Sequence, residues 1–243
     1  MINRVQAGVL SDRYLDVFLG DWKGLGFLIL QPVLVALCAG AVWSGTQPGP
    51  TLYFVLCFST LFFGCVNACR EIVKEGPIYR RERLVNLEIP AYVASKLWIL
   101  GMLGFGQTLL FYGGIRYFLV LAGNPVLMVL ALYLSLLAGT ALGLAISAVV
   151  GSDVVALGLV PVAMVPQLIF SKLVLPAKSL EGPLAWMEQA TLAKWSYRAM
   201  EEVTASPPDY GALAWAFGIL LAAVVLLTTF AGVALKLKDG AHA

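Results

Sequence analysis

Six apolar runs of about 20 residues each constrain what this chain can fold into. They cover roughly residues 24–43, 51–69, 92–115, 125–149, 154–175 and 211–235. A helix of about 20 residues spans the hydrocarbon core of a bilayer, and lipid offers no partner for an open backbone. None of the runs alternates in polarity as the strands of a membrane barrel do. The sequence therefore predicts an all-α polytopic membrane protein with six transmembrane helices, one for each run.

The composition agrees with lipid as the main solvent. Of the 243 residues, 60% are hydrophobic and 12% are charged, and the charged share is about half that of a soluble domain. A soluble fold of this size could not cover itself with so little polar surface. The net charge is only +2, so no nucleic-acid partner is indicated.

Residues 1–23 form a mixed polar and apolar segment before the first run. On a helix, one face carries the apolar side chains and the opposite face carries charge, which makes the segment amphipathic. The apolar set is Leu10, Tyr14, Val17, Phe18 and Trp22, and the charged set is Asp12, Arg13, Asp16 and Lys23. The segment is too long and too mixed for a signal peptide. It predicts a short amphipathic helix lying on the membrane surface, with a solvated helix packed on protein as the alternative.

The stretch 70–90 holds nine of the chain's 30 charged side chains. Each would cost about 2.5–3.5 kcal/mol at the bilayer centre, so the stretch must protrude from the membrane. Residues 70–75 are expected to extend the second helix, Gly76 and Pro77 to stop it, and a new short helix to follow.

The basic residues of this stretch also set the orientation. The loop near residues 44–50 has no Lys or Arg, so the positive-inside rule places 70–90 and both termini in the cytoplasm. The segment between the fifth and sixth runs then lies outside, although it contains Lys172, Lys178, Lys194 and Arg198. Residues 70–90 could dock on a soluble partner or form a basic collar on anionic headgroups.

Three stretches resemble one transporter family. The stretch REIVKEGPIYRRERLVNLEIPAYVASKLW is similar to the first cytoplasmic loop of the membrane domains of type-2 ABC transporters, especially the G-subfamily (the white/pleiotropic drug resistance group). The matching residues are Glu75, Tyr79, Arg81, Glu82 and the run Ala91 to Lys96. The stretches ALGLVPVAMVPQLIFSKLVLP and PLAWMEQATLAKWSYRAMEEV resemble the family's fifth span and last outside loop, except that Lys172 stands where the family usually has Gly.

The resemblance implies a role for each part of the chain. Residues 1–23 would be the connecting helix, 24–243 the six-helix transmembrane domain, 70–90 a coupling loop with its coupling helix at 78–87, and 176–208 an outside re-entrant element. A nucleotide-binding domain would engage Glu75, Tyr79, Arg80, Arg81, Glu82 and Arg83. A second permease copy would complete the path of an exporter for a lipid-like or hydrophobic substrate. The expected location is the bacterial inner membrane.

In the family, the second and fifth spans line the route. The second span carries Phe54, Phe58 and Phe62 on one helix face, and the fifth offers Met164 and Gln167. The alternative for each is ordinary packing or contact with lipid. Four polar side chains are expected to bond between helices instead: Gln31, Asn67, Gln107 and Gln167.

Motifs for catalysis are missing from the sequence. It contains no P-loop, so the chain is predicted to be no enzyme and to carry no cofactor, with ATP and Mg²⁺ bound by the nucleotide-binding domain. The one histidine is His242, and Cys38, Cys57, Cys65 and Cys69 are expected to be reduced packing residues, so no metal site is predicted. A membrane scaffold without transport activity, whose charged loop docks a soluble protein, remains the alternative function.

Overall fold

A computed structural model describes residues 4–171 and 183–242, and every regular element in those ranges is helical. The elements are α1 (Arg4–Gly20), α2 (Trp22–Trp43), α3 (Pro50–Ala68), η1 (Val73–Glu75), α4 (Gly76–Arg83), α5 (Ile89–Phe118), α6 (Pro125–Val149), α7 (Asp153–Ile169), α8 (Pro183–Ala190), α9 (Leu192–Thr204) and α10 (Tyr210–His242).

Five helical stretches among the described residues are long and apolar enough to cross a membrane. They are Gly24–Trp43, Pro50–Arg83, Ile89–Phe118, Pro125–Val149 and Tyr210–Asp239. The prediction of an all-α polytopic membrane protein is thereby confirmed. The predicted fifth span, 154–175, corresponds to α7, which has 17 residues and a length of about 25 Å. Residues 172–175 lie outside the described part of the chain.

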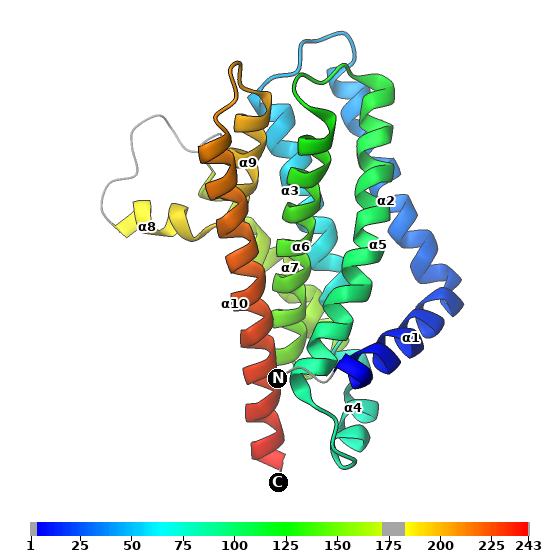
Figure 1. The fold of residues 1–243 in the computed structure, drawn as a ribbon. Helices are drawn as coiled ribbons and strands as arrows, with labels where there is room; N and C mark the ends of the chain where they lie inside the picture. Colours follow the sequence, from blue (N-terminus) through cyan, green and yellow to red (C-terminus); the bar gives the residue numbers. More distant parts are fainter. Residues whose placement is uncertain (1–3, 172–182, 243) are drawn as a thin grey trace.

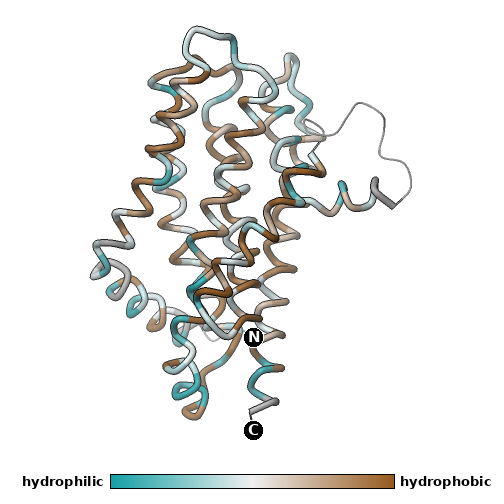
Figure 2. The backbone as a smooth tube through the Cα atoms, turned by 180° about the vertical axis from the view of Figure 1, so that it is seen from behind, coloured by the Kyte–Doolittle hydropathy of each residue, from teal (hydrophilic) through white to brown (hydrophobic). Residues whose placement is uncertain are grey.

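The two ends of the bundle differ in character (Figure 1). Helices α1 and α4 and the last turns of α10 lie at one end, which we call the α4 end. The loops 44–49 and 119–124 and helix α9 lie at the other, which we call the α9 end. Figure 2 shows hydrophilic segments at the α4 end and hydrophobic residues along the bundle. The predicted outside loop, 176–208, contributes α8 and α9, and its residues 176–182 lie outside the described part.

Helices α3 and α6 approach each other closely at a stripe of small residues. A Cβ atom on Gly64 would lie 2.0 Å from the carbonyl oxygen of Leu136, and one on Gly139 would lie 2.0 Å from that of Leu61. The stripe on α6 repeats every four residues, through Ser135, Gly139, Gly143 and Ser147. Small residues at this spacing let membrane helices pack backbone against backbone.

Polar side chains join neighbouring helices, as the sequence predicted. Asn67 Nδ2 donates to Gln107 Oε1 at 2.8 Å, and Gln107 Nε2 donates to Gln31 Oε1 at 3.1 Å. Gln167 Oε1 accepts from the backbone N–H of Ala193 at 3.1 Å. These bonds tie α2, α3 and α5 together, and α7 to α9.

Candidate coupling site at the α4 end

Helix α4 and the turn that follows it present an outer surface of basic and apolar side chains. Arg80 and Arg81 are exposed, and so are Ile78, Leu84 and Val85, with exposed fractions of 47%, 87% and 75%. Exposed apolar side chains grouped with charged ones are typical of a surface that binds protein. The sequence-predicted residues Arg80 and Arg81 are therefore placed where another molecule can reach them.

The elements before and after α4 differ from the prediction. Instead of a longer second helix, α3 ends at Ala68, turns follow, and η1 leads into α4. Two N–H groups freed there, those of Ile72 and Val73, donate to Ser147 Oγ of α6 at 3.0 Å each. Helix α4, the predicted coupling helix, ends at Arg83 rather than at residue 87. Asn86 takes a left-handed conformation with φ of 66°, which turns the chain toward α5.

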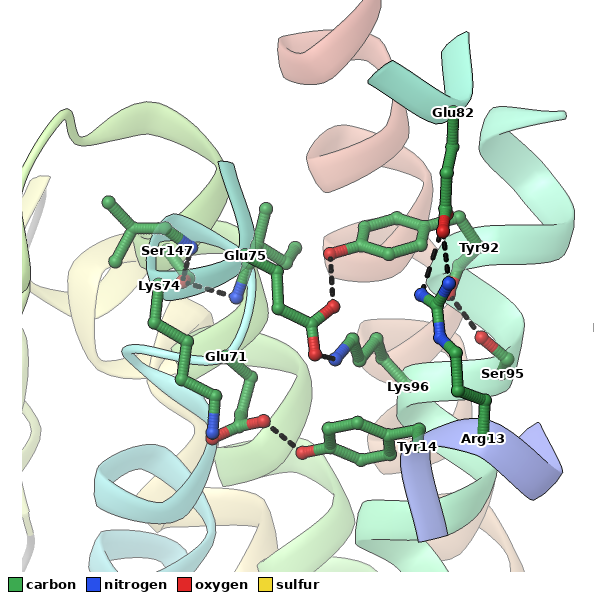
Figure 3. A network of polar contacts seen from close by, with 12 residues as sticks. Arg13, Tyr14, Glu71, Lys74, Glu75, Glu82, Tyr92, Ser95, Lys96 and Ser147 are labelled. Carbon is green, nitrogen blue, oxygen red and sulfur yellow. Dashed lines mark hydrogen bonds and ion pairs between the residues drawn. The ribbon is translucent and has the colours of Figure 1, made fainter. Parts of the chain in front are cut away.

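Glu75 points into the protein rather than toward a docking partner. Its Oε1 atom lies 2.6 Å from Nζ of Lys96 on α5, and the two side chains are 14% and 2% exposed. Its Oε2 atom accepts a hydrogen bond from the Tyr92 hydroxyl at 3.2 Å. The pair is the centre of the polar network in Figure 3. Glu75, predicted as a contact for the nucleotide-binding domain, therefore holds η1 against α5.

Helix α1 is attached to the same network. Tyr14 donates a hydrogen bond to Glu71, and its ring lies 3.5 Å from the Lys96 ammonium (Figure 3). Burial, together with the charge of Glu71, raises the pKa of Tyr14 well above its ordinary value. Leu10 and Tyr14 are buried in one cluster with residues of α5 and α6. On these two residues the structure agrees with the packed alternative for the N-terminal helix, since they face protein.

A second contact joins α1 directly to α4. Arg13 forms an ion pair with Glu82 (Figure 3). In addition, Gln6 Nε2 donates to the carbonyl oxygen of Asn86 at 3.3 Å, and Gln6 Oε1 accepts from the N–H of Glu88 at 3.0 Å. Glu82 therefore binds α1, and α1 holds both α4 and the turn that follows it.

The third anchor of α4 is the end of α10. Asp239 Oδ2 accepts from the Tyr79 hydroxyl at 3.0 Å and from Arg83 Nε at 2.8 Å. The Tyr79 side chain is buried, and its ring lies 5.1 Å from that of Tyr92. Tyr79 and Arg83 thus point inward. Sequence reasoning missed Asp239, and it named Lys96 in the family match without predicting its pairing with Glu75; a charge within a predicted span was the available signal for Lys96.

The residues predicted to line a path belong to α3 and α7. Phe54 is 4% exposed, and its ring contacts those of Phe58 and Tyr197 at 5.9 Å each. Met164 is 2% exposed in the same cluster, and Phe62 faces outward with 37% exposure. Phe54 and Met164 pack inside this chain, which agrees with the alternative of ordinary packing. The structure does not bring the five residues to one open surface, so a shared path role stays a prediction.

The sequence match decides the family. The model of the ABC-2 type transporter family matches residues 5–204. This chain belongs to the ABC-2 type transporter family. It is also 27% identical, over 215 residues, to an ABC transporter ATP-binding/permease protein of Mycobacterium tuberculosis. That alignment covers 80% of this chain and 25% of the relative, so this chain spans about a quarter of the relative's length.

Family membership fixes the general role of the chain. An ABC-2 membrane domain is the permease part of an ABC transporter. The α4 end described above is then the polar end of a permease domain, where elements from α1, α3, α5 and α10 converge.

Proposed function

We propose that this chain is the membrane half of an ATP-driven exporter and that a nucleotide-binding domain docks on α4. The observation that carries the proposal is the two-sided construction of α4. Its outer face offers exposed basic and apolar side chains, and its inner face is bonded to α1 and α10 and contacts a ring of α5. Such an element can receive a push from a soluble domain and pass it to the bundle.

The inner contacts give the proposed push several routes. Glu82 would pass a movement of α4 to α1 through Arg13. Tyr79 and Arg83 would pass the same movement to α10 through Asp239. Tyr79 also contacts the Tyr92 ring of α5.

The rest of the proposal concerns assembly and cargo. Helix α7 would be the sixth crossing, and its exposed apolar residues Val155, Val162 and Val165, together with Phe62, would face a second copy across the path. The α4 end would lie in the cytoplasm of a bacterium, with both termini there. The order of α1, α4, α8 and α9 along the chain supports a G-subfamily type of exporter, and the apolar side chains of Phe54, Phe58 and Phe62 favour a lipid-like cargo.

Thiol labelling tests the orientation. In a Cys38→Ser background, since Cys38 is the exposed native cysteine of the described residues, Leu84→Cys should react with a membrane-impermeant maleimide only in inverted vesicles. Val120→Cys at the α9 end, where the native residue is 86% exposed, is the matched control and should react only in right-side-out vesicles. Reaction of Leu84→Cys from the outside would overturn the orientation.

Docking and coupling need a separate measurement. Addition of the ATP-binding subunit that co-purifies with the chain should shield Leu84→Cys from the maleimide. Arg81→Glu should allow continued ATP hydrolysis while movement of a fluorescent-tailed phospholipid probe stops. Normal probe movement by Arg81→Glu would show that the coupling assignment is wrong. If no ATP-hydrolysing chain ever co-purifies, the scaffold alternative is favoured.

A further inference from the structure

A groove of about 800 Å³ runs between α5 and α10 at the α4 end. Its walls include Pro90, Val93 and Leu97 of α5 and Thr228 and Val233 of α10. The volume lies within the range of ligand sites that hold a small organic molecule. No residue of α3 or α7 lines it, so it is separate from the proposed path and from the face proposed for a second copy.

Small residues keep the groove open. Ala94 on α5 and Gly232 on α10 lie in its walls. A Cβ atom on Gly232 would meet only Ile89 Cγ2, at 3.8 Å. The space at this position is therefore available to a ligand, in contrast to the closed contact at Gly139.

Most of the residues that line the groove between its charged mouth and its far end are apolar. The lining extends over nine positions on each helix, from 89 to 97 and from 228 to 236. The eight intervals between them span about 12 Å, compared with about 15 Å for the hydrocarbon of one leaflet. Thr228 and Thr229 donate their hydroxyls to backbone carbonyls of their own helix, at 2.7 and 2.8 Å. Their hydroxyl donors are therefore already satisfied within α10.

The mouth of the groove is charged. Arg83, Lys236 and Glu88 line it, so two cations meet one anion. Arg83 is oriented by Asp239 and by the carbonyl oxygen of Leu87, whereas Lys236 is exposed and forms no ion pair with a described residue. A cation at the membrane surface above an apolar wall matches a phosphate above a hydrocarbon chain.

We propose that this groove binds an anionic phospholipid from the leaflet at the α4 end. An acyl chain lies between Val93 and Val233, and the headgroup phosphate contacts Lys236. A soluble protein could reach only the mouth, because the remaining wall lies at the depth of the hydrocarbon. Arg83 belongs both to the mouth and to the α4–α10 anchor, so an occupied site adjoins the element that we propose as the coupling helix.

Lipid retention by the purified full chain tests the proposal. After exchange into detergent, phosphatidylglycerol and phosphatidylcholine of the same acyl composition are added, and native mass spectrometry counts the bound lipid. We expect wild type to retain phosphatidylglycerol preferentially. Lys236→Gln should reduce that preference about fivefold. Arg116→Gln, an exposed basic residue at the other end of α5, is the control and should leave the preference unchanged.

A second pair of variants tests the apolar wall. Gly232→Leu and, from the opposite wall, Ala94→Leu should each abolish retention of both lipids, whereas Gly106→Leu on α5, with nothing within 4 Å of its Cβ position, should not. Retention at the wild-type level by a folded Gly232→Leu or Ala94→Leu protein would overturn the proposal. So would an unchanged preference in Lys236→Gln, or displacement of the lipid by excess glycerol 3-phosphate, which would indicate a headgroup site alone.

Discussion

Removing the buried cation of Lys96 should strongly destabilise the protein. Lys96 Nζ lies 2.6 Å from Glu75 Oε1, and the Lys96 side chain is only 2% exposed. Lys96→Met keeps the length of the side chain but leaves Glu75 as a buried anion without its cation, a change that costs about 3–5 kcal/mol. Each kcal/mol lowers Tm by roughly 2–4 °C in a chain of this size, so we expect a decrease on the order of 6–20 °C.

The double variant separates the lost pair from general damage. Adding Glu75→Gln removes the unpaired charge and keeps an acceptor for the Tyr92 hydroxyl, so Lys96→Met/Glu75→Gln should recover a large part of the loss. Arg198→Met is the matched control, because Arg198 pairs with Glu202 at 3.5 Å and is 43% exposed; it should cost less than about 1 kcal/mol. Thermal unfolding in nanodiscs measures all four proteins. A Lys96→Met protein within 2 °C of wild type, or a double variant less stable than Lys96→Met, would refute this reasoning.

Three further predictions concern other contacts. Gly139→Leu should prevent α3 and α6 from packing and cost more than about 3 kcal/mol, seen as loss of the cooperative melt, while Gly106→Leu keeps it; a normal melt for Gly139→Leu would contradict the close approach. Because burial and Glu71 raise the pKa of Tyr14, its stabilising effect should be complete below the unfolded pKa of about 10 and decline as pH rises above it. Stability should therefore fall more steeply above pH 10 in wild type than in Tyr14→Phe, and parallel pH profiles would argue against this. Finally, Glu82→Arg should reduce ATP-coupled movement of the lipid probe and Arg13→Glu/Glu82→Arg should restore it; no restoration would mean that the α1–α4 ion pair has no part in coupling.

Local features of the sequence predicted much of the fold. The apolar runs gave the helices that cross the membrane, and the density of charge in 70–90 placed a short helix outside the lipid. The four amide side chains also bond between helices as expected, because an amide inside a membrane has few other ways to satisfy its donors and acceptors. The residue type and its position within an apolar run were enough to predict these interhelical bonds.

The direction of each charged side chain could not be predicted in the same way. Glu75, Tyr79, Glu82 and Arg83 resembled a docking surface, but they bond inward to residues of α1, α5 and α10. Arg83 and Asp239 are 156 positions apart, and no periodicity connects residues at that separation. The stripe of Ser135, Gly139, Gly143 and Ser147 was visible in the sequence; its regular spacing could have identified the face of α6 that meets α3.

The backbone contact between α3 and α6 limits where a solute could move. Backbone carbonyl oxygens of the opposite helix lie where side chains at Gly64 and Gly139 would otherwise be. At this contact, α3 and α6 therefore leave no space for a solute to pass between them. Any conduit must therefore be bounded by other surfaces of the chain. If its walls move, α3 and α6 should swing together as one rod, because peeling them apart would expose tightly fitted backbone to lipid.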